Sequence, residues 1–122
     1  CKALADESIK VNVTLIFSVA QAILSAKAGA KYVSPFVGRL DDNSHNGVEL
    51  IAQISALYNQ QMIRTEVLAA SLRDVPSDSK CFGVGADIVT MPPAVFEKMY
   101  NHVLTDKGLD QFDKDYAASI QE

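Results

Sequence analysis

The stretch KYVSPFV, residues 31–37, runs directly into GRL, residues 38–40, and its character changes on the way. Its first half is apolar and β-branched, which predicts a buried strand. A proline, an aromatic ring, a glycine and an arginine then follow within five positions. A strand that ends in this mixture predicts a ligand site at its carboxyl end, because parallel α/β folds bind ligands there.

Strands and helices alternate on both sides of this segment. The order predicts an α/β fold with parallel strands and crossover helices. Four βα units either form a small doubly wound sheet or make up half of a barrel, since a complete barrel needs about 200 to 250 residues. We expect strands at 11–17, 31–37, 65–71 and 86–92, helices at 2–8, 18–30, 48–61, 75–85, 94–106 and 108–120, and a polar loop at 38–47.

The composition narrows the classes of function. The 122 residues carry a net charge of -4, and the lysines and arginines are scattered, which argues against nucleic acid as a partner. No apolar window is long enough to span a membrane, and no signal-peptide pattern is visible. Cys1 and Cys81 lack CxxC spacing, which predicts reduced thiols, a cytoplasmic location and a packing role for Cys81. Because the chain starts at Cys1 rather than Met, we expect it to be a piece of a longer protein.

Polar residues interrupt the first strand. Asn12 and Thr14 share one face by alternation, and Val11, Val13 and Leu15 share the other. A buried parallel strand is normally apolar on both faces. The two polar side chains therefore indicate either a site or a hydrogen-bonded buried pair.

The next two strands each end in a serine followed by an arginine. Ser34 and Phe36 share a face, and Arg39 follows the flexible Gly38. The third strand ends at Ser71, and its arginine, Arg73, lies two residues further on. Guanidinium groups and hydroxyls are donors that suit a phosphate. The paired pattern predicts a phosphate site, whereas a lone arginine would indicate a solvated loop.

Other candidates are weaker. Asp41, Asp42 and His45 lack a recognised metal-ligand spacing, so we predict a solvated loop and no metal. Lys10 lies at the amino end of its strand, opposite the rim where barrel enzymes do their chemistry, which favours a structural role.

Together these segments resemble a known family, the small transaldolases and their relatives the fructose-6-phosphate aldolases. The resemblance runs in order over nearly all of the chain, and SPFVGR together with NVTLIFS is specific to it. The matching segments are NVTLIFS (12–18), AGAKYVSPFVGRLDD (28–42), VLAASLR (67–73), GADIVTMP (85–92) and LTDKGLDQF (104–112).

The resemblance implies a (β/α)8 TIM barrel of which residues 1–122 are a partial domain, units five to eight plus a C-terminal helix. It implies transfer of a dihydroxyacetone unit between sugar phosphates through a lysine Schiff base, in the pentose phosphate pathway, without metal or cofactor. The implied roles are Asn12 and Thr14 at the reaction intermediate and its water, Ser34 and Phe36 on the cavity wall, and Arg39, Ser71 and Arg73 at the phosphate.

The same resemblance implies parts that this chain lacks. The family's Schiff-base lysine and its acid/base aspartate lie upstream of Cys1, so we expect the fragment to be inactive alone and a missing N-terminal half to complete the barrel. The C-terminal helix resembles one that packs on neighbouring subunits, which implies a homo-oligomer. Phe36 favours transaldolase over fructose-6-phosphate aldolase, which resembles this pattern with a tyrosine there. A non-catalytic half-barrel that binds sugar phosphates or assembles with itself is the alternative.

Overall fold

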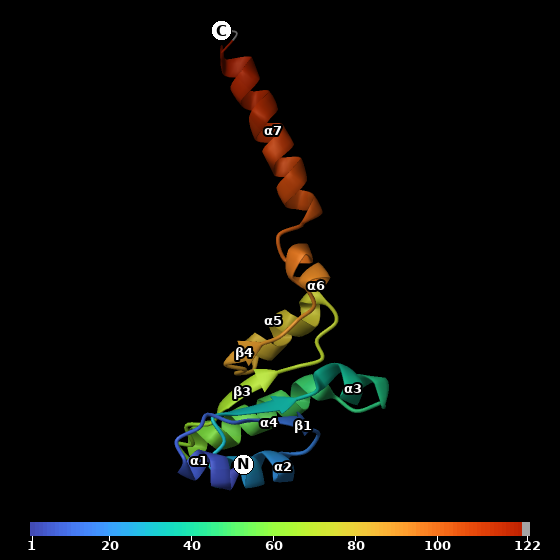
Figure 1. The fold of residues 1–122 in the computed structure, drawn as a ribbon. Helices are drawn as coiled ribbons and strands as arrows, with labels where there is room; N and C mark the ends of the chain where they lie inside the picture. Colours follow the sequence, from blue (N-terminus) through green and yellow to red (C-terminus); the bar gives the residue numbers. More distant parts are fainter. Residues whose placement is uncertain (121–122) are drawn as a thin grey trace.

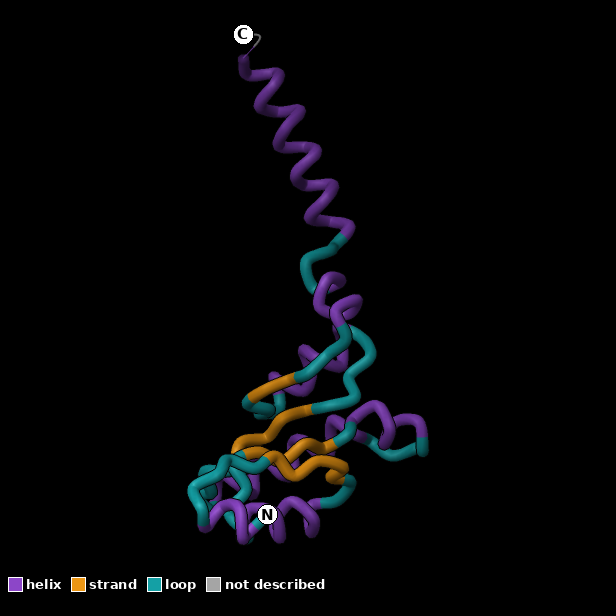
Figure 2. Tube along the Cα trace, in the orientation of Figure 1, coloured by secondary structure: helices purple, strands orange, loops and turns teal. Residues whose placement is uncertain are grey.

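Four short parallel strands form one sheet in the computed structural model, which describes residues 1–120 (Figures 1 and 2). The strands are β1 (Asn12–Ile16), β2 (Tyr32–Pro35), β3 (Glu66–Ala69) and β4 (Ile88–Val89), and they lie side by side in chain order. Each neighbouring pair runs parallel. A doubly wound sheet reverses its order at a switch point. The unbroken order confirms the α/β class and matches one half of a (β/α)8 barrel.

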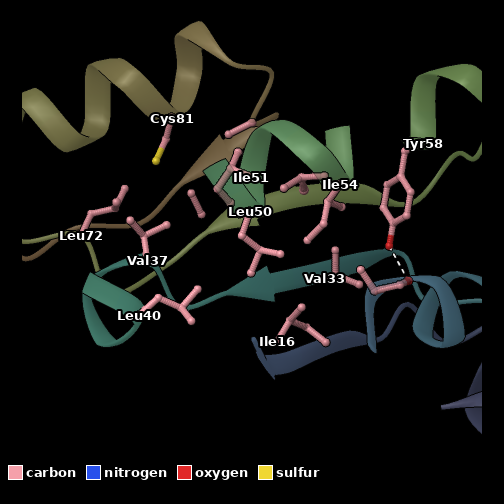
Figure 3. Close-up of a cluster of buried hydrophobic side chains, with 14 residues drawn as sticks. Ile16, Val33, Val37, Leu40, Leu50, Ile51, Ile54, Tyr58, Leu72 and Cys81 are labelled. Carbon is pink, nitrogen blue, oxygen red and sulfur yellow. Dashed lines mark hydrogen bonds between the residues drawn. The ribbon is translucent and has the colours of Figure 1, made fainter. Parts of the chain in front are cut away.

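Helices α2 (Val19–Lys27), α4 (Gly47–Gln60) and α5 (Val75–Gly83) connect the strands and pack against the sheet. The core lies between them and includes Val33 and Val67 from the strands and Ile51 and Ile54 from α4, all four almost fully buried. Figure 3 labels Val33, Ile51 and Ile54 in this cluster. Each such side chain contributes about 1.5–3 kcal/mol of hydrophobic free energy. Helix α4 supplies more buried residues than any other helix and is therefore the main support of the sheet.

Side-chain caps explain where the connecting helices begin. Ser18, Asn46 and Asp74 each accept a hydrogen bond from a backbone N–H in the first turn of the helix that follows. These bonds satisfy donors that a helix leaves unpaired at its start. Helix α2 ends before Gly29, whose φ of +91° favours glycine.

The predicted loop at 38–47 is wrong in its first half, because a short helix, α3 (Val37–Asp42), occupies it. Val37 and Leu40 are buried and lie one helical turn apart, but the glycine and the aspartates around them suggested a loop. The first helices of the chain end earlier than predicted, since α1 spans only Lys2–Asp6.

The predicted boundary between the last two helices is also wrong. Helix α6 (Pro93–Lys98) is short, and α7 (Val103–Ile120) runs unbroken through Gly108. His102, expected inside a helix, precedes α7 and accepts a hydrogen bond through Nδ1 from the backbone N–H of Leu104. Helix α7 therefore begins after His102, where this bond satisfies a backbone N–H of its first turn, and not at Gly108.

Helix α7 projects away from the sheet, as Figure 1 shows. Leu109, Phe112 and Tyr116 follow helical spacing along α7 and are 56–69% exposed. A helix with an apolar stripe and no partner is typical of a segment that packs against another surface. Within residues 1–120, no helix combines the length and apolar character needed to cross a lipid bilayer.

Strand β1 departs from simple alternation. The pairing with β2 shifts register between Val13 and Ile16, and Leu15 has a φ of +55°. Ile16 is therefore 2% exposed in the core, and Leu15 is 47% exposed, so the prediction that Leu15 packs with Val11 and Val13 is wrong. An extra residue in the strand has exchanged the two faces, as a bulge does.

Candidate functional site

The first pair of candidate residues meets across β1 and β2. The Ser34 hydroxyl donates to Asn12 Oδ1 over 2.8 Å. Ser34 is buried, whereas Asn12 and Thr14 are exposed on the same strand. The bond turns the amide oxygen of Asn12 toward Ser34, so its NH₂ group points elsewhere and can donate to a ligand.

Aromatic rings and an arginine follow at the carboxyl ends of the same two strands. Phe36 is half-buried and bridges to Ala70 beyond β3. Phe17, which sequence reasoning did not select, meets its ring edge-on, with 6.0 Å between centroids. The exposed Arg39 guanidinium lies 5.1 Å from the centroid of the Phe36 ring. A cation over an aromatic face is attracted to it, so Phe36 helps to place Arg39.

The start of α3 is joined to the chain leaving β3. The Val37 and Gly38 backbone N–H groups donate to the carbonyls of Ala70 and Ser71, over 3.0 and 3.1 Å. A Cβ on Gly38 would lie 2.1 Å from Ser71 O and 3.1 Å from Arg73 Nε. Gly38 is therefore needed for space and not, as predicted, for flexibility.

Ser71 adopts a conformation that serine rarely adopts, with a φ of +61°. Residues held in this left-handed region cost roughly 1–3 kcal/mol and gather at functional sites. The turn at Ser71 directs the chain from β3 back past Gly38, and Arg73 follows against that glycine.

Arg73 lies between two pockets. One, of about 150 Å³, is lined by Gly38, Asp42, Ser71 and Arg73 among others. The other has a volume of about 400 Å³ and lies beyond the carboxyl ends of β3 and β4. Ser71 and Arg73 line this pocket as well, together with Thr90. Thr90 was missed because β4 is short, although the rule of ligands at strand ends points to it.

The structure thus places Arg39 in α3 and Arg73 in the loop after β3, two adjoining segments at the carboxyl ends of β2 and β3. Arg39 is next to Gly38 in the chain, and Arg73 packs on Gly38 in space. Their joint binding of one phosphate remains a prediction.

Two aspartates dismissed as a solvated loop have defined contacts. Asp42 Oδ1 accepts a hydrogen bond from Arg73 Nη1 over 2.7 Å. Asp41 Oδ1 accepts from the Gly47 backbone N–H at the start of α4. Among residues 1–120, no three histidine, cysteine, aspartate or glutamate side chains gather in a group able to hold a metal ion.

The lysines lie away from this rim. Lys10 and Lys31 precede β1 and β2, and both line a pocket of about 530 Å³ at the amino ends of the strands, as expected for Lys10. The other lysines lie in helices: Lys2, Lys27, Lys80, Lys98, Lys107 and Lys114.

Two buried groups in α5 have raised pKa values. Burial, with the nearby Asp78 and Asp41 carboxylates, raises the pKa of Cys81 to about 11, so its thiol is protonated at neutral pH. Cys81 is fully buried, which confirms its packing role (Figure 3). Burial, followed by the charge of Asp74, raises the pKa of Asp78, whose carboxylate oxygens have no hydrogen-bond partner in the part of the chain described.

Comparison with solved structures shows the fold alone. The chain is similar to mandelate oxidase with (S)-2-phenylpropionate, with a TM-score of 0.57 and 23% identity over 74% of this chain and 27% of that one. A mandelate oxidase mutant with (S)-mandelic acid gives a TM-score of 0.56 at 20% identity, over 74% of this chain and 27% of that one.

Sequence comparison is closer. A "Probable transaldolase" of Paracoccus denitrificans is 55% identical over all of this chain and 56% of its own length. Those of Caulobacter vibrioides and Brucella ovis are 56% and 52% identical, over 99% and 100% of this chain. The chain spans about half the length of each, 56% in both cases. Residues 1–122 match the family described as Transaldolase/Fructose-6-phosphate aldolase, and the chain belongs to that family.

Proposed function

We propose that the protein containing this chain is a transaldolase that transfers a dihydroxyacetone unit from fructose 6-phosphate or sedoheptulose 7-phosphate to an aldose phosphate. The observation that carries the proposal is the placement of Arg39, Ser71 and Arg73 at the carboxyl ends of adjoining strands in a chain of this family. Guanidinium forks with a hydroxyl suit a phosphate ester. The phosphate would then anchor the substrate above the sheet.

The reaction would use a Schiff base. A lysine ε-amine attacks the ketose carbonyl and releases water, and the protonated imine accepts the electron pair of the breaking C–C bond. Asn12 would donate its amide NH₂ to the intermediate, and Thr14 would hold a water beside it. Ser34 and Phe36 would form the cavity wall. This sequence of steps corresponds to a place in the pentose phosphate pathway, in the cytoplasm.

The lysine and the acid/base aspartate would come from a half-barrel that completes the sheet. We propose that residues 1–122 are one partial barrel domain, since none of the lysines lies at the carboxyl end of a strand. We further propose a homo-oligomer in which α7 packs on a neighbouring subunit, because its apolar stripe is exposed.

Phe36 favours transaldolase over fructose-6-phosphate aldolase, because a phenyl ring has no hydroxyl to take part in proton transfer. The alternative from a different class is a non-catalytic module that binds sugar phosphates. This alternative is supported by two observations. The candidate phosphate-binding residues lie within this chain, and no lysine lies beside them at the carboxyl ends of the strands.

Borohydride trapping distinguishes these functions. The complete polypeptide and residues 1–122 are each incubated with fructose 6-phosphate, reduced and weighed by mass spectrometry. Transaldolase or aldolase chemistry predicts a three-carbon adduct on the complete polypeptide and none on residues 1–122. In a parallel sample, an aldose phosphate added before the reduction accepts the three-carbon unit from the unreduced Schiff base, so a transaldolase then shows no adduct. Phosphate-ester binding without an adduct on either would favour the module and contradict our proposal.

A further inference from the structure

The contact between Asp42 and Arg73 joins the last residue of α3 to the loop after β3. Asp42 Oδ1 accepts from Arg73 Nη1 over 2.7 Å, a distance typical of a charge-assisted hydrogen bond. A guanidinium has five N–H donors. One bond to a carboxylate therefore holds the group in place and leaves other donors for a second anion.

The surroundings of this pair differ from those of an ordinary surface ion pair. Arg73 Nε lies 3.1 Å from the point where a Cβ of Gly38 would be, so the side chain crosses the glycine closely. In the same helical turn, Asn43 Nδ2 donates to the backbone carbonyl of Arg39 over 2.8 Å. The end of α3 thus holds the side chain of one arginine and the backbone of the other.

We propose that Asp42 is a positioning residue for phosphate-ester binding, which acts by holding the Arg73 guanidinium in the geometry that binds the phosphate. The proposal rests on the phosphate site of the proposed function. Arginine loses substantial side-chain freedom when it is fixed, and a partner that fixes it beforehand lowers the cost of binding.

An opposing effect has to be separated in the test. The Asp42 carboxylate repels a phosphate, so removing its charge alone would strengthen binding. Asparagine keeps an amide oxygen that accepts a hydrogen bond and lacks the charge, whereas alanine lacks both. Positioning and charge therefore predict different orders for the two variants.

The experiment measures binding of fructose 6-phosphate and of inorganic phosphate to the full chain by calorimetry. We expect Asp42→Ala to weaken binding about tenfold and Asp42→Asn to stay within about threefold of the natural protein. Asp6→Ala is the control, because Asp6 pairs with Lys2 over 3.3 Å in a more exposed ion pair outside the site. It should leave binding unchanged.

Two outcomes would overturn the inference. Either Asp42→Ala and Asp42→Asn bind alike, or Asp42→Ala still weakens binding when Arg73 is already glutamine. An unchanged affinity in Arg73→Gln itself would instead refute the phosphate site of the proposed function. Circular dichroism of each variant establishes that it is folded before the affinities are compared.

Discussion

Gly38→Ala tests whether the contact between helix α3 and the loop after β3 is needed for the proposed phosphate site. The added Cβ would lie 2.1 Å from Ser71 O and 2.9 Å from Ser71 Oγ. Non-bonded heavy atoms prefer a separation of about 3.5 Å. Helix α3 and the loop after β3 must therefore move apart by more than about 1 Å. The Gly38 N–H···O bond to Ser71, 3.1 Å in this structure, would be lost with that movement.

The stability cost follows from these contacts. Overpacking costs about 1–3 kcal/mol, and a lost backbone hydrogen bond adds about 1 kcal/mol. Alanine also restricts the unfolded chain, which returns about 0.4–1 kcal/mol. We expect the free energy of unfolding to fall by about 1–3.6 kcal/mol. Because Arg73 moves away from Arg39, phosphate binding should weaken at least about tenfold, as misplacement by about 1 Å is costly.

Urea unfolding and calorimetric titration with fructose 6-phosphate measure the two effects. Gly83→Ala is the matched control, since nothing lies within 4 Å of its added Cβ at the end of α5. That variant should be neutral or more stable by up to about 1 kcal/mol. If Gly38→Ala has the same stability and the same fructose 6-phosphate affinity as Gly83→Ala, then α3 does not contact the loop after β3 as described, and our reasoning is wrong.

Three further predictions follow from charges and burial. Arg39→Gln and Arg73→Gln should each weaken fructose 6-phosphate binding by about ten- to a hundredfold in calorimetry, the worth of a charge-assisted hydrogen bond; an unchanged affinity in either removes that residue from the site. Because the folded protein raises the pKa of Asp78 above its ordinary value of 3.8, stability falls as pH rises from 3.8 through the raised pKa. Asp78→Asn should therefore stabilise by at least about 1 kcal/mol at neutral pH, with the gain fading below pH 3.8; a gain independent of pH in urea unfolding would contradict this. The buried Cys81 thiol should resist alkylation at neutral pH while the exposed Cys1 reacts, and mass spectrometry of a digest would detect the reverse.

Local patterns in the sequence predicted the order of the strands and helices. The β-branched runs located all four strands, and the helix predicted at 48–61 lies within one residue of α4 at each end. The cap at Asp74 and the glycine at the end of α2 are likewise local signals, so they were available from the sequence.

Errors arose where distant segments decide the structure. Leu15 is exposed because β1 shifts register against β2, and no nearby residue announces that shift. The roles of Gly38 and Asp42 depend on contacts with Ser71 and Arg73, more than thirty residues away. Spacing along the chain selected Arg39 and Arg73 as candidates for the site, but it did not identify Phe36 and Asp42 as the groups that contact them.

Among residues 1–120, strands β1 and β4 each pair with a neighbouring strand on one side only. Their outer backbone groups form two templates of the same polarity, one at each flank of the sheet. A second polypeptide that pairs with one edge strand leaves the other edge strand unpaired. Further copies can then add to the free edge, and the assembly becomes an open-ended polymer. A polypeptide that pairs with both edge strands at once leaves no edge free, so no further copy can add. We therefore expect the chain to form fibres with a partner that pairs with one edge of the sheet, and a closed ring of strands with a partner that pairs with both edges.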